Sequence, residues 1–431
     1  MTVVFNIFLF LFILDFHILA NNIWESSKIY KTKNKIVSYQ TILTGLDVLE
    51  LNNFDLLENK KVAIVANHTS SNRFDRNIAD LLRIYSSVQN PIIFTPEHGF
   101  KGNKSAGQII NDEDNYFDAR VVSLYGSNKK PLINDLKEID CIVFDLQDVG
   151  VRYYTYVSTL TLVMEAASEN NIPLIVLDRP NPLRGDVIEG PILQNKYKSF
   201  VGLHPIPIRH GMTMGELAIM INENKWFAND KKVDLTVVPM NGWKRSMWYD
   251  ETGKYWKPPS PNLNTFNSAI AYLGTCLLEG TNVSEGRGTS DPFLKIGSPW
   301  INKNEFNEEL NNLKLPGVHF FPTDFVPVSI PGKAVSPKYV DEKCYGTYLN
   351  ITDREQYDPL LTGVGVLLTL KKMYSDQFSW DNNFFIDKLF GSDYLRKYIA
   401  QERNILSFNP IWEKDQIQFY SFRFPYLIYD E

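Results

Sequence analysis

Between residues 60 and 240 the sequence repeats one pattern, in which a short apolar run ends in polar residues and a segment with helical spacing follows. The apolar runs lie at residues 61–67, 92–95, 121–126, 141–145, 173–178 and 234–239. Runs of this length, rich in β-branched residues, are typical of buried strands. Strands that alternate with helices favour βαβ units and a parallel sheet covered on both faces. We therefore predict an α/β fold around a parallel sheet.

The helices of this region are predicted at residues 77–88 and 154–170 and from Thr213 onward, where Thr213 and Glu216 have the spacing of a capping box. Beyond Asn241 the alternation fades. Strand-like segments at 318–321 and 325–330 and helical segments at 267–279, 359–374 and 393–402 then predict a smaller α+β domain. We place the domain boundary near residues 229–241, which divides the chain into units of 40–235 and 236–431.

Composition excludes several classes of protein. The 431 residues suggest two or three structural units, and a net charge of -6 argues against a nucleic-acid partner. Three widely spaced cysteines, Cys141, Cys276 and Cys344, exclude a disulfide framework and show no metal-ligand spacing. The histidines share no helical spacing either, so no metal site is predicted. Nothing in the sequence specifies an oligomeric state.

The first twenty residues are almost wholly apolar, and a polar segment begins at Asn21. This pattern predicts a secretory signal cleaved after Ala20, with export to a periplasm, the cell surface or the medium. The alternative is an uncleaved membrane anchor. No later stretch approaches the ~20 apolar residues of a membrane span, so no stable span is expected after cleavage.

Polar side chains follow each predicted strand, and the carboxyl ends of parallel strands meet at one edge of a sheet. The residues expected to converge there are Asn67, His68, Glu97, His98, Tyr125, Gln147, Asp148, Asp178 and Arg179. Two carboxylates in one crevice suit glycoside hydrolysis, in which one protonates the leaving oxygen. Asp145 lies inside its strand and is predicted to be structural. Asp178 either serves the site, caps a turn or pairs with Arg179.

Two further clusters contain candidate residues. Arg152 follows Asp148 closely, and it either neutralises that carboxylate or holds an anionic substrate group. Residues 279–289 form a turn-rich loop that presents Glu285 and Arg287. Its glycine spacing matches no phosphate-binding motif, and the loop at 67–73 contains no glycine, so a nucleotide-dependent enzyme is disfavoured. The long loop at 101–115 is a candidate substrate lid.

Five motifs, taken together, resemble those of the bacterial exo-β-N-acetylmuramidases, glycoside hydrolase family 171. The motifs are Thr95-Pro96-Glu97-His98-Gly99, the stretch 145–156, Asp178-Arg179-Pro180-Asn181-Pro182, Pro259-Ser260-Pro261-Asn262 and the stretch 279–289. The resemblance covers roughly residues 44–400 in the expected order. One departure is Asn67-His68-Thr69-Ser70, where the family has Asn-Gln-Thr-Gly, and it leaves the role of position 68 open.

The resemblance implies a Rossmann-like domain that binds no nucleotide or other cofactor, a smaller domain, and a cleft between them. It implies release of N-acetylmuramic acid from the non-reducing end of peptidoglycan fragments, with Glu97 as catalytic acid/base. The second catalytic group is Asp148, Glu285 or the substrate's own N-acetyl group. The substrate-binding candidates are Asn67, His68, His98, Arg152, Tyr154, Asn282 and Arg287.

An exo-muramidase activity requires two properties of the site. Glu97 must hold a proton near neutral pH, which requires burial or a like charge such as Asp148 or Glu285 nearby. The lactyl carboxylate of muramic acid needs a cation, for which Arg152 and Arg287 are the candidates. The competing hypothesis is a non-catalytic cell-wall protein that binds muropeptides on the same scaffold without forming product.

Overall fold

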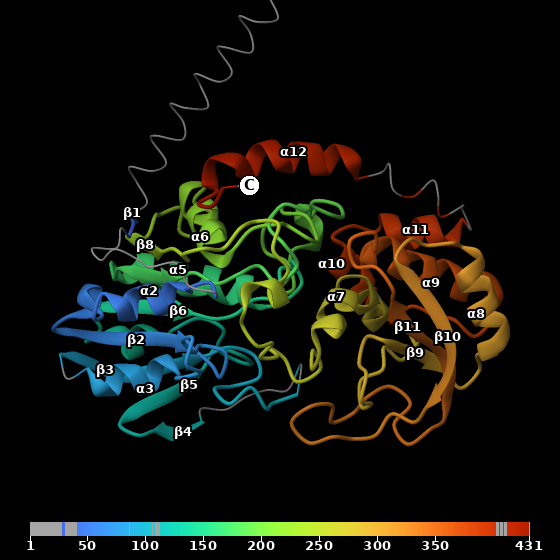
Figure 1. The fold of residues 1–431 in the computed structure, drawn as a ribbon, viewed down its shortest axis with the longest axis horizontal. Helices are drawn as coiled ribbons and strands as arrows, with labels where there is room; N and C mark the ends of the chain where they lie inside the picture. The colour runs from blue at the N-terminus through green and yellow to red at the C-terminus, as the bar shows by residue number, and fades with distance from the viewer. Residues whose placement is uncertain are drawn as a thin grey trace, which may run out of the picture.

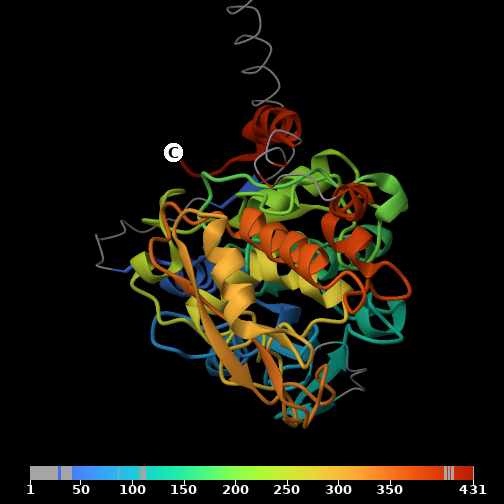
Figure 2. The same ribbon diagram turned by 90° about the vertical axis from the view of Figure 1, so that its right-hand side faces the viewer.

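The computed structural model describes residues 28–30, 41–85, 87–105, 107, 113–401, 405, 408 and 412–430. The predicted signal segment at 1–20 lies outside these residues, as does much of the predicted lid. Figure 1 shows a sheet-based domain beside a smaller domain, and Figure 2 shows the smaller domain from its own side. Within the described ranges, no helix is both long enough and apolar enough to cross a membrane.

The larger domain is built on an eight-stranded sheet in the order β1-β8-β7-β6-β2-β3-β5-β4. Every neighbouring pair is parallel except β4 and β5, so the predicted parallel α/β sheet is confirmed. The strands are β1 (Lys28–Ile29), β2 (Lys60–Ala66), β3 (Val88–Thr95), β4 (Glu113–Tyr116), β5 (Ala119–Ser123), β6 (Cys141–Asp145), β7 (Leu174–Leu177) and β8 (Leu235–Val238).

Alternate residues of each central strand enter different cores, as the two-residue period of a strand requires. In β2, Val62 and Ile64 face one core, whereas Ala63 and Val65 face the other. Helices of this domain contribute to both cores, so the sheet is covered on both faces. The helices are α2 (Gly45–Leu51) and α3 (Ile78–Ile84) on one side, and α5 (Tyr156–Asn170) and α6 (Met214–Glu223) on the other.

The start of α6 confirms the predicted capping box and explains Asp178. The Thr213 side chain accepts from the backbone N–H of Glu216, whose carboxylate accepts from the N–H of Thr213. Asp178, directly after β7, accepts from the Thr213 hydroxyl at 2.7 Å and from the Gly215 N–H at 2.8 Å. Asp178 therefore holds a helix start and does not pair with the guanidinium of Arg179.

The smaller domain combines a three-stranded antiparallel sheet, in the order β10-β11-β9, with helices that continue the core of the larger domain. The helices predicted near 267–279, 359–374 and 393–402 are confirmed. The elements are α7 (Phe266–Thr275), β9 (Lys295–Ser298), α8 (Lys303–Asn312), β10 (Val318–Phe325), β11 (Cys344–Ile351), α9 (Pro359–Met373), α10 (Phe385–Phe390) and α11 (Tyr394–Ala400).

The strand predicted at 325–330 is wrong. Strand β10 ends at Phe325, and residues 326–338 form an irregular segment, here called the arm, that connects β10 with β11. Val326 and Val328 make the arm look apolar in the sequence, yet they are 44% and 42% exposed. The sheet is instead completed by β9 and β11, which were not predicted.

The last helix leaves the smaller domain and returns to the larger one (Figure 1). Arg423, at the end of α12 (Glu413–Arg423), donates to the carbonyl oxygen of Gly211 at 2.6 Å. Beyond it the Tyr429 hydroxyl donates to Asp178 Oδ2 at 2.6 Å. The carboxyl-terminal segment therefore closes the region around α6.

Candidate active site

A cavity of about 800 Å³ opens where the carboxyl edge of the large sheet meets the smaller domain. This size suits a ligand-binding pocket. Its polar and charged lining from the larger domain comprises Glu97, His98, Ser105, Tyr125, Lys129, Tyr153, Tyr154 and Thr155. Beyond residue 236 the lining includes Ser260, Tyr272, Glu279, Glu285, Arg287, Lys333, Ser336 and Lys338.

A tight turn after β3 presents Glu97. His98 and Gly99 both have positive φ, 77° and 72°, which is uncommon for a residue with a side chain. The turn is closed twice, because His98 Nδ1 lies 2.8 Å from the Lys104 carbonyl and the Lys104 N–H donates to the His98 carbonyl at 3.2 Å. A non-glycine residue held in this conformation is typical of functional sites, where the surrounding contacts offset the strain.

Glu97 is only 8% exposed, and two donors fix its carboxylate. Oε1 accepts from the backbone N–H of Gly107 at 2.9 Å, and Oε2 accepts from the Thr155 hydroxyl at 2.8 Å. Tyr125, at the end of β5, also interacts with this carboxylate. Burial and the charge of Glu97 raise the pKa of Tyr125, so its hydroxyl stays protonated. Glu97 is therefore buried and held by uncharged donors where it lines the cavity.

His98 is buried beside Glu97, and burial lowers the pKa of its imidazole. A neutral ring has one donor and one acceptor nitrogen. Since Nδ1 faces the Lys104 carbonyl, it must carry the proton, which leaves Nε2 as an acceptor. His98 therefore supports the turn through one nitrogen and offers an uncharged acceptor through the other.

Glu285 is the second buried carboxylate of the pocket, and cations compensate its charge. Lys338 lies 3.1 Å from Oε2, and Arg287 Nε lies 3.3 Å from Oε1. Burial favours the neutral form, but Lys338 and Arg287 outweigh it and lower the pKa of Glu285. Arg287 also pairs with Glu279 at 2.6 Å. Glu285 is consequently an anion held within an ion-pair network.

Ten residues were predicted as catalytic or substrate-binding, and the structure brings five of them to one cavity: Glu97, His98, Tyr154, Glu285 and Arg287. The remaining five, which do not line it, are Asn67, His68, Asp148, Arg152 and Asn282.

Asn67 and His68 lie behind the pocket and support its walls. Asn67 Oδ1 accepts from the N–H and hydroxyl of Thr69, while its amide donates to the Tyr156 hydroxyl at 2.8 Å. His68 Nε2 lies 2.8 Å from the Pro258 carbonyl, and burial lowers the pKa of the ring. Asn282, in the smaller domain, ties its loop to Gln377 and Ser379.

The prediction that Arg152 meets Asp148 or a substrate carboxylate is wrong. Its guanidinium is 2% exposed and donates to the carbonyl oxygens of Pro191, Ile206 and Leu389 at 2.8–2.9 Å. Leu389 belongs to the smaller domain, so Arg152 joins the two domains through backbone oxygens. Burial without a carboxylate lowers the pKa of Arg152 to about 9.

Asp148 is not part of the cavity lining, and no cation pairs with it among the residues that the structure describes. Its Oδ2 accepts from the Gly150 N–H at 2.6 Å, within a turn of its own backbone. Burial raises the pKa of Asp148 to about 7. Its position makes Asp148 a turn-forming carboxyl, so of the two predicted candidates for the second catalytic carboxylate only Glu285 shares the cavity with Glu97.

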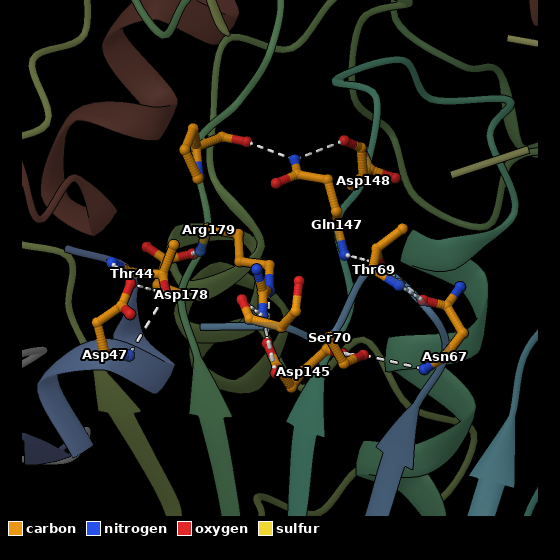
Figure 3. A network of polar contacts seen from close by, with 12 residues as sticks. Thr44, Asp47, Asn67, Thr69, Ser70, Asp145, Gln147, Asp148, Asp178 and Arg179 are labelled. Atoms are coloured by element: carbon orange, nitrogen blue, oxygen red, sulfur yellow. Dashed lines mark hydrogen bonds and ion pairs between the residues drawn. The ribbon is translucent and has the colours of Figure 1, made fainter. Parts of the chain in front are cut away.

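Asp145 confirms the structural role predicted for it. Its carboxylate accepts from Arg179 Nε at 2.5 Å and Nη2 at 2.8 Å, and both side chains are fully or almost fully buried. Figure 3 shows this pair at the ends of the central strands, beside Ser70, Gln147 and Asp178. Gln147 spans the same edge by donating to the carbonyls of Asp148 and Pro180.

Several lining residues were missed by sequence reasoning. Thr155 belongs to the stretch 145–156, and Glu279 to the stretch 279–289, but nothing set them apart within those motifs. Lys333 and Lys338 lie in no motif at all, because the arm that carries them has no periodicity. In the described ranges no group of three His, Cys, Asp or Glu side chains is placed to hold a metal ion.

Comparison with known proteins gives consistent matches over nearly the whole chain. Residues 62–267 match the family described as "Exo-beta-N-acetylmuramidase NamZ, N-terminal", and residues 270–429 match its "C-terminal" counterpart. The peptidoglycan beta-N-acetylmuramidase NamZ of Bacillus subtilis (strain 168) is 41% identical over 402 residues, covering 92% of this chain and 94% of that protein.

Two crystal structures of DUF1343 family proteins from Bacteroides fragilis NCTC 9343 have the same fold. One has a TM-score of 0.82 and 33% identity, covering 91% of this chain and 100% of the other. The second has a TM-score of 0.75 and 34% identity, covering 90% of this chain and 99% of the other.

Proposed function

This chain belongs to the exo-beta-N-acetylmuramidase NamZ family, and from that premise we propose that it releases N-acetylmuramic acid from the non-reducing end of peptidoglycan fragments. The observation that carries the proposal is the pair of buried carboxylates, Glu97 and Glu285, that line one cavity in different electrostatic settings. Glycoside hydrolysis uses two such groups in distinct roles. Here Glu97 accepts hydrogen bonds from uncharged donors, whereas Glu285 pairs with Lys338 and Arg287.

In this proposal Glu97 is the general acid/base. A proton on the carboxyl is transferred to the glycosidic oxygen as the bond to the anomeric carbon breaks. The hydrogen bonds from Gly107 and Thr155 fix the orientation of the carboxyl group. The ionised form that remains can then take a proton from water in the second half of the reaction.

Glu285 is the proposed stabiliser of the positive charge that develops on the sugar ring. Lys338 and Arg287 keep it ionised, so it carries negative charge when the sugar ring becomes positive. The nucleophile is either this carboxylate, which would then form a glycosyl ester that water hydrolyses, or the N-acetyl group of the substrate. A substrate whose N-acetyl group is replaced separates these two routes, because only the second requires that group.

The direct test uses two chromogenic substrates, a β-N-acetylmuramide and the corresponding β-N-acetylglucosaminide. We expect the purified protein to release chromophore from the first and little from the second. Digestion of peptidoglycan fragments should yield free N-acetylmuramic acid and leave internal bonds intact. Binding of muropeptides without any product would support a non-catalytic sugar-binding protein and contradict this proposal.

We also propose that the protein is exported and acts on the cell wall from outside the cytoplasm. The support is the apolar segment at residues 1–20, which is followed by a polar region. Amino-terminal sequencing of the protein recovered from the envelope and the medium should begin at Asn21. Recovery of the intact chain from the cytoplasm would contradict export.

A further inference from the structure

A muramoyl residue differs from a glucosaminyl residue by a lactyl ether that carries a carboxylate. A pocket that selects the former needs a cation whose hydrogen bonds are not already committed. The cationic side chains that line the cavity are Lys129, Arg287, Lys333 and Lys338. Their existing partners decide which of them can serve.

Arg287 and Lys338 are committed to the protein's own carboxylates. Arg287 is bound by Glu279 and Glu285, so a substrate carboxylate beside it would meet two like charges. The Lys338 ammonium donates to two backbone carbonyls at 2.8 and 2.9 Å and to Glu285 at 3.1 Å. An ammonium has three protons, and all three are used.

Lys333 differs from both. Among the residues that the structure describes, no carboxylate lies within ion-pair distance of its ammonium. Partial burial lowers the pKa of Lys333, opposed by the charge of Asp291, which itself pairs with Lys295. Lys129, by contrast, is exposed and lies 4.3 Å above the ring of Phe200.

The arm holds Lys333 in a fixed position. Ile330 and Ala334 exchange two backbone hydrogen bonds at 2.8 and 2.9 Å, which closes a turn around Lys333. The buried Asn262 donates to the carbonyl of Lys333 at 2.8 Å. Gly332, at a φ of 74°, approaches so closely that an added Cβ would lie 2.3 Å from the carbonyl oxygen of Asn103.

Through the contact of Gly332 with Asn103, the arm of the smaller domain packs against the loop that follows Glu97. Lys333 therefore lines the cavity on a backbone that these contacts hold in place. Preorganisation of this kind lowers the entropy cost of binding. Four cationic side chains and the carboxyl groups of Glu97, Glu279 and Glu285 line the cavity, so its cations outnumber its carboxyl groups and it can accept an anionic substrate group.

We propose that Lys333 binds the lactyl carboxylate of the muramoyl residue and thereby selects it over an uncharged N-acetylglucosaminyl residue. The inference rests on the proposed muramidase activity and specifies the group that recognises its substrate. It also replaces the sequence-based candidates, since Arg152 is enclosed by carbonyls and Arg287 by carboxylates.

The test follows the logic of a double-mutant cycle, with one change made in the protein and the other in the substrate. Wild type and Lys333→Met are assayed on a chromogenic muramide with the free lactyl carboxylate and on the same compound with that group as its neutral methylamide. For the acid we expect the variant to lose about 10- to 100-fold in kcat/KM, mainly through KM, as for loss of a charge-assisted hydrogen bond. For the methylamide the two proteins should be equally active, and Lys333→Arg should recover part of the loss.

Lys129→Met is the matched comparison, since it also removes a lysine ammonium from the pocket lining. It should leave the ratio of acid to methylamide turnover at the wild-type value. An equal loss on both substrates in Lys333→Met, or no loss on either, would overturn the role of Lys333. If the wild-type protein cleaves neither muramide, the proposed muramidase function is overturned instead. Failure of the role of Lys333 and failure of the proposed function are therefore distinguishable.

Discussion

Two groups of buried charges meet at the carboxyl edge of the large sheet. One surrounds Asp145 and Arg179, and in the other Glu97 at that edge shares a cavity with Glu285 of the smaller domain. In the sequence they look alike, because each begins with a carboxylate at the end of an apolar run. In the structure Arg179 forms two hydrogen bonds to Asp145 and a third to the Ser71 carbonyl. Glu97 has only uncharged donors, and it faces a cavity of about 800 Å³.

The comparison teaches that position at a strand end does not decide the role of a carboxylate. The role depends on what the neighbouring strands and the second domain supply. Arg179, at the end of β7, neutralises Asp145. No guanidinium or ammonium bonds to Glu97 in the described part of the chain, and the arm encloses space beside it. The first cluster holds the sheet edge together, and the second is available for chemistry.

The largest expected effect is on stability, in the first cluster. Arg179→Met leaves the carboxylate of Asp145 buried and unpaired, which should cost about 3–5 kcal/mol of unfolding free energy. Urea unfolding of the variant measures this loss. Arg354→Met, which removes a half-exposed partner of Asp250, is the control and should cost no more than about 1 kcal/mol. A variant of Arg179 with wild-type stability but no activity would place this cluster in the catalytic machinery.

The second largest effect is on activity, in the second cluster. Glu97→Gln keeps the size of the side chain but cannot donate the proton, so kcat/KM should fall at least about 100-fold, or roughly 3 kcal/mol. The unfolding midpoint should change little, because the amide oxygen can still accept from the Gly107 N–H while the amide NH2 donates to the Thr155 hydroxyl oxygen. Near-wild-type turnover would remove Glu97 from the reaction. If Glu97→Gln lowered the unfolding free energy as much as Arg179→Met, Glu97 would be a structural carboxylate like Asp145.

A smaller effect is expected at Thr155, whose hydroxyl orients the Glu97 carboxylate. Thr155→Val should reduce kcat about tenfold, as for loss of one hydrogen bond to a charged group, and leave KM nearly unchanged. The helix should persist, because the Thr155 side chain does not cap α5. Thr159→Val removes a buried hydroxyl one turn later, bonded to a carbonyl, and should retain full activity.

The smallest effect concerns Asp148, which adjoins the first cluster and does not line the pocket. Its folded pKa of about 7 exceeds the roughly 3.9 of an unfolded aspartate, so its stabilising contribution is complete below about pH 4 and is lost as pH rises through 7. Asp148→Asn removes this dependence. The melting temperature of the variant should therefore rise relative to wild type between pH 5 and 8. Parallel melting curves across that range would refute the assignment.

Much of the larger domain was predictable from the sequence, since its strands are continuous apolar runs with capped helices between them. Both Glu97 and Asp145 were located in this way, and Asp145 was correctly taken as structural because it lies within its strand. The smaller domain was harder. Strand β11 mixes buried and half-exposed positions, whereas the arm carries exposed valines that imitate a strand.

Two cations could not be assigned from the sequence, because their partners lie far away in the chain. The Arg152 guanidinium donates to the carbonyl oxygen of Leu389, which lies 237 residues later in the chain. Lys333 faces the pocket because its turn rests on Asn103 and is bonded by Asn262. Contacts between residues so far apart leave no local sequence pattern. Neither the burial of Arg152 nor the lack of a carboxylate partner for Lys333 among the described residues could therefore be predicted.

The return of the chain end to the larger domain has a consequence for how the protein is made. The Tyr429 hydroxyl donates to Asp178 and the Ile428 N–H donates to Glu216 at 2.9 Å, so two buried carboxylates of the sheet domain have partners 251 and 212 residues later in the chain. During synthesis a ribosome exposes these partners long after the strands of the sheet. The sheet domain, although encoded first, therefore reaches its final packing only after the smaller domain and residues 428–429 have emerged.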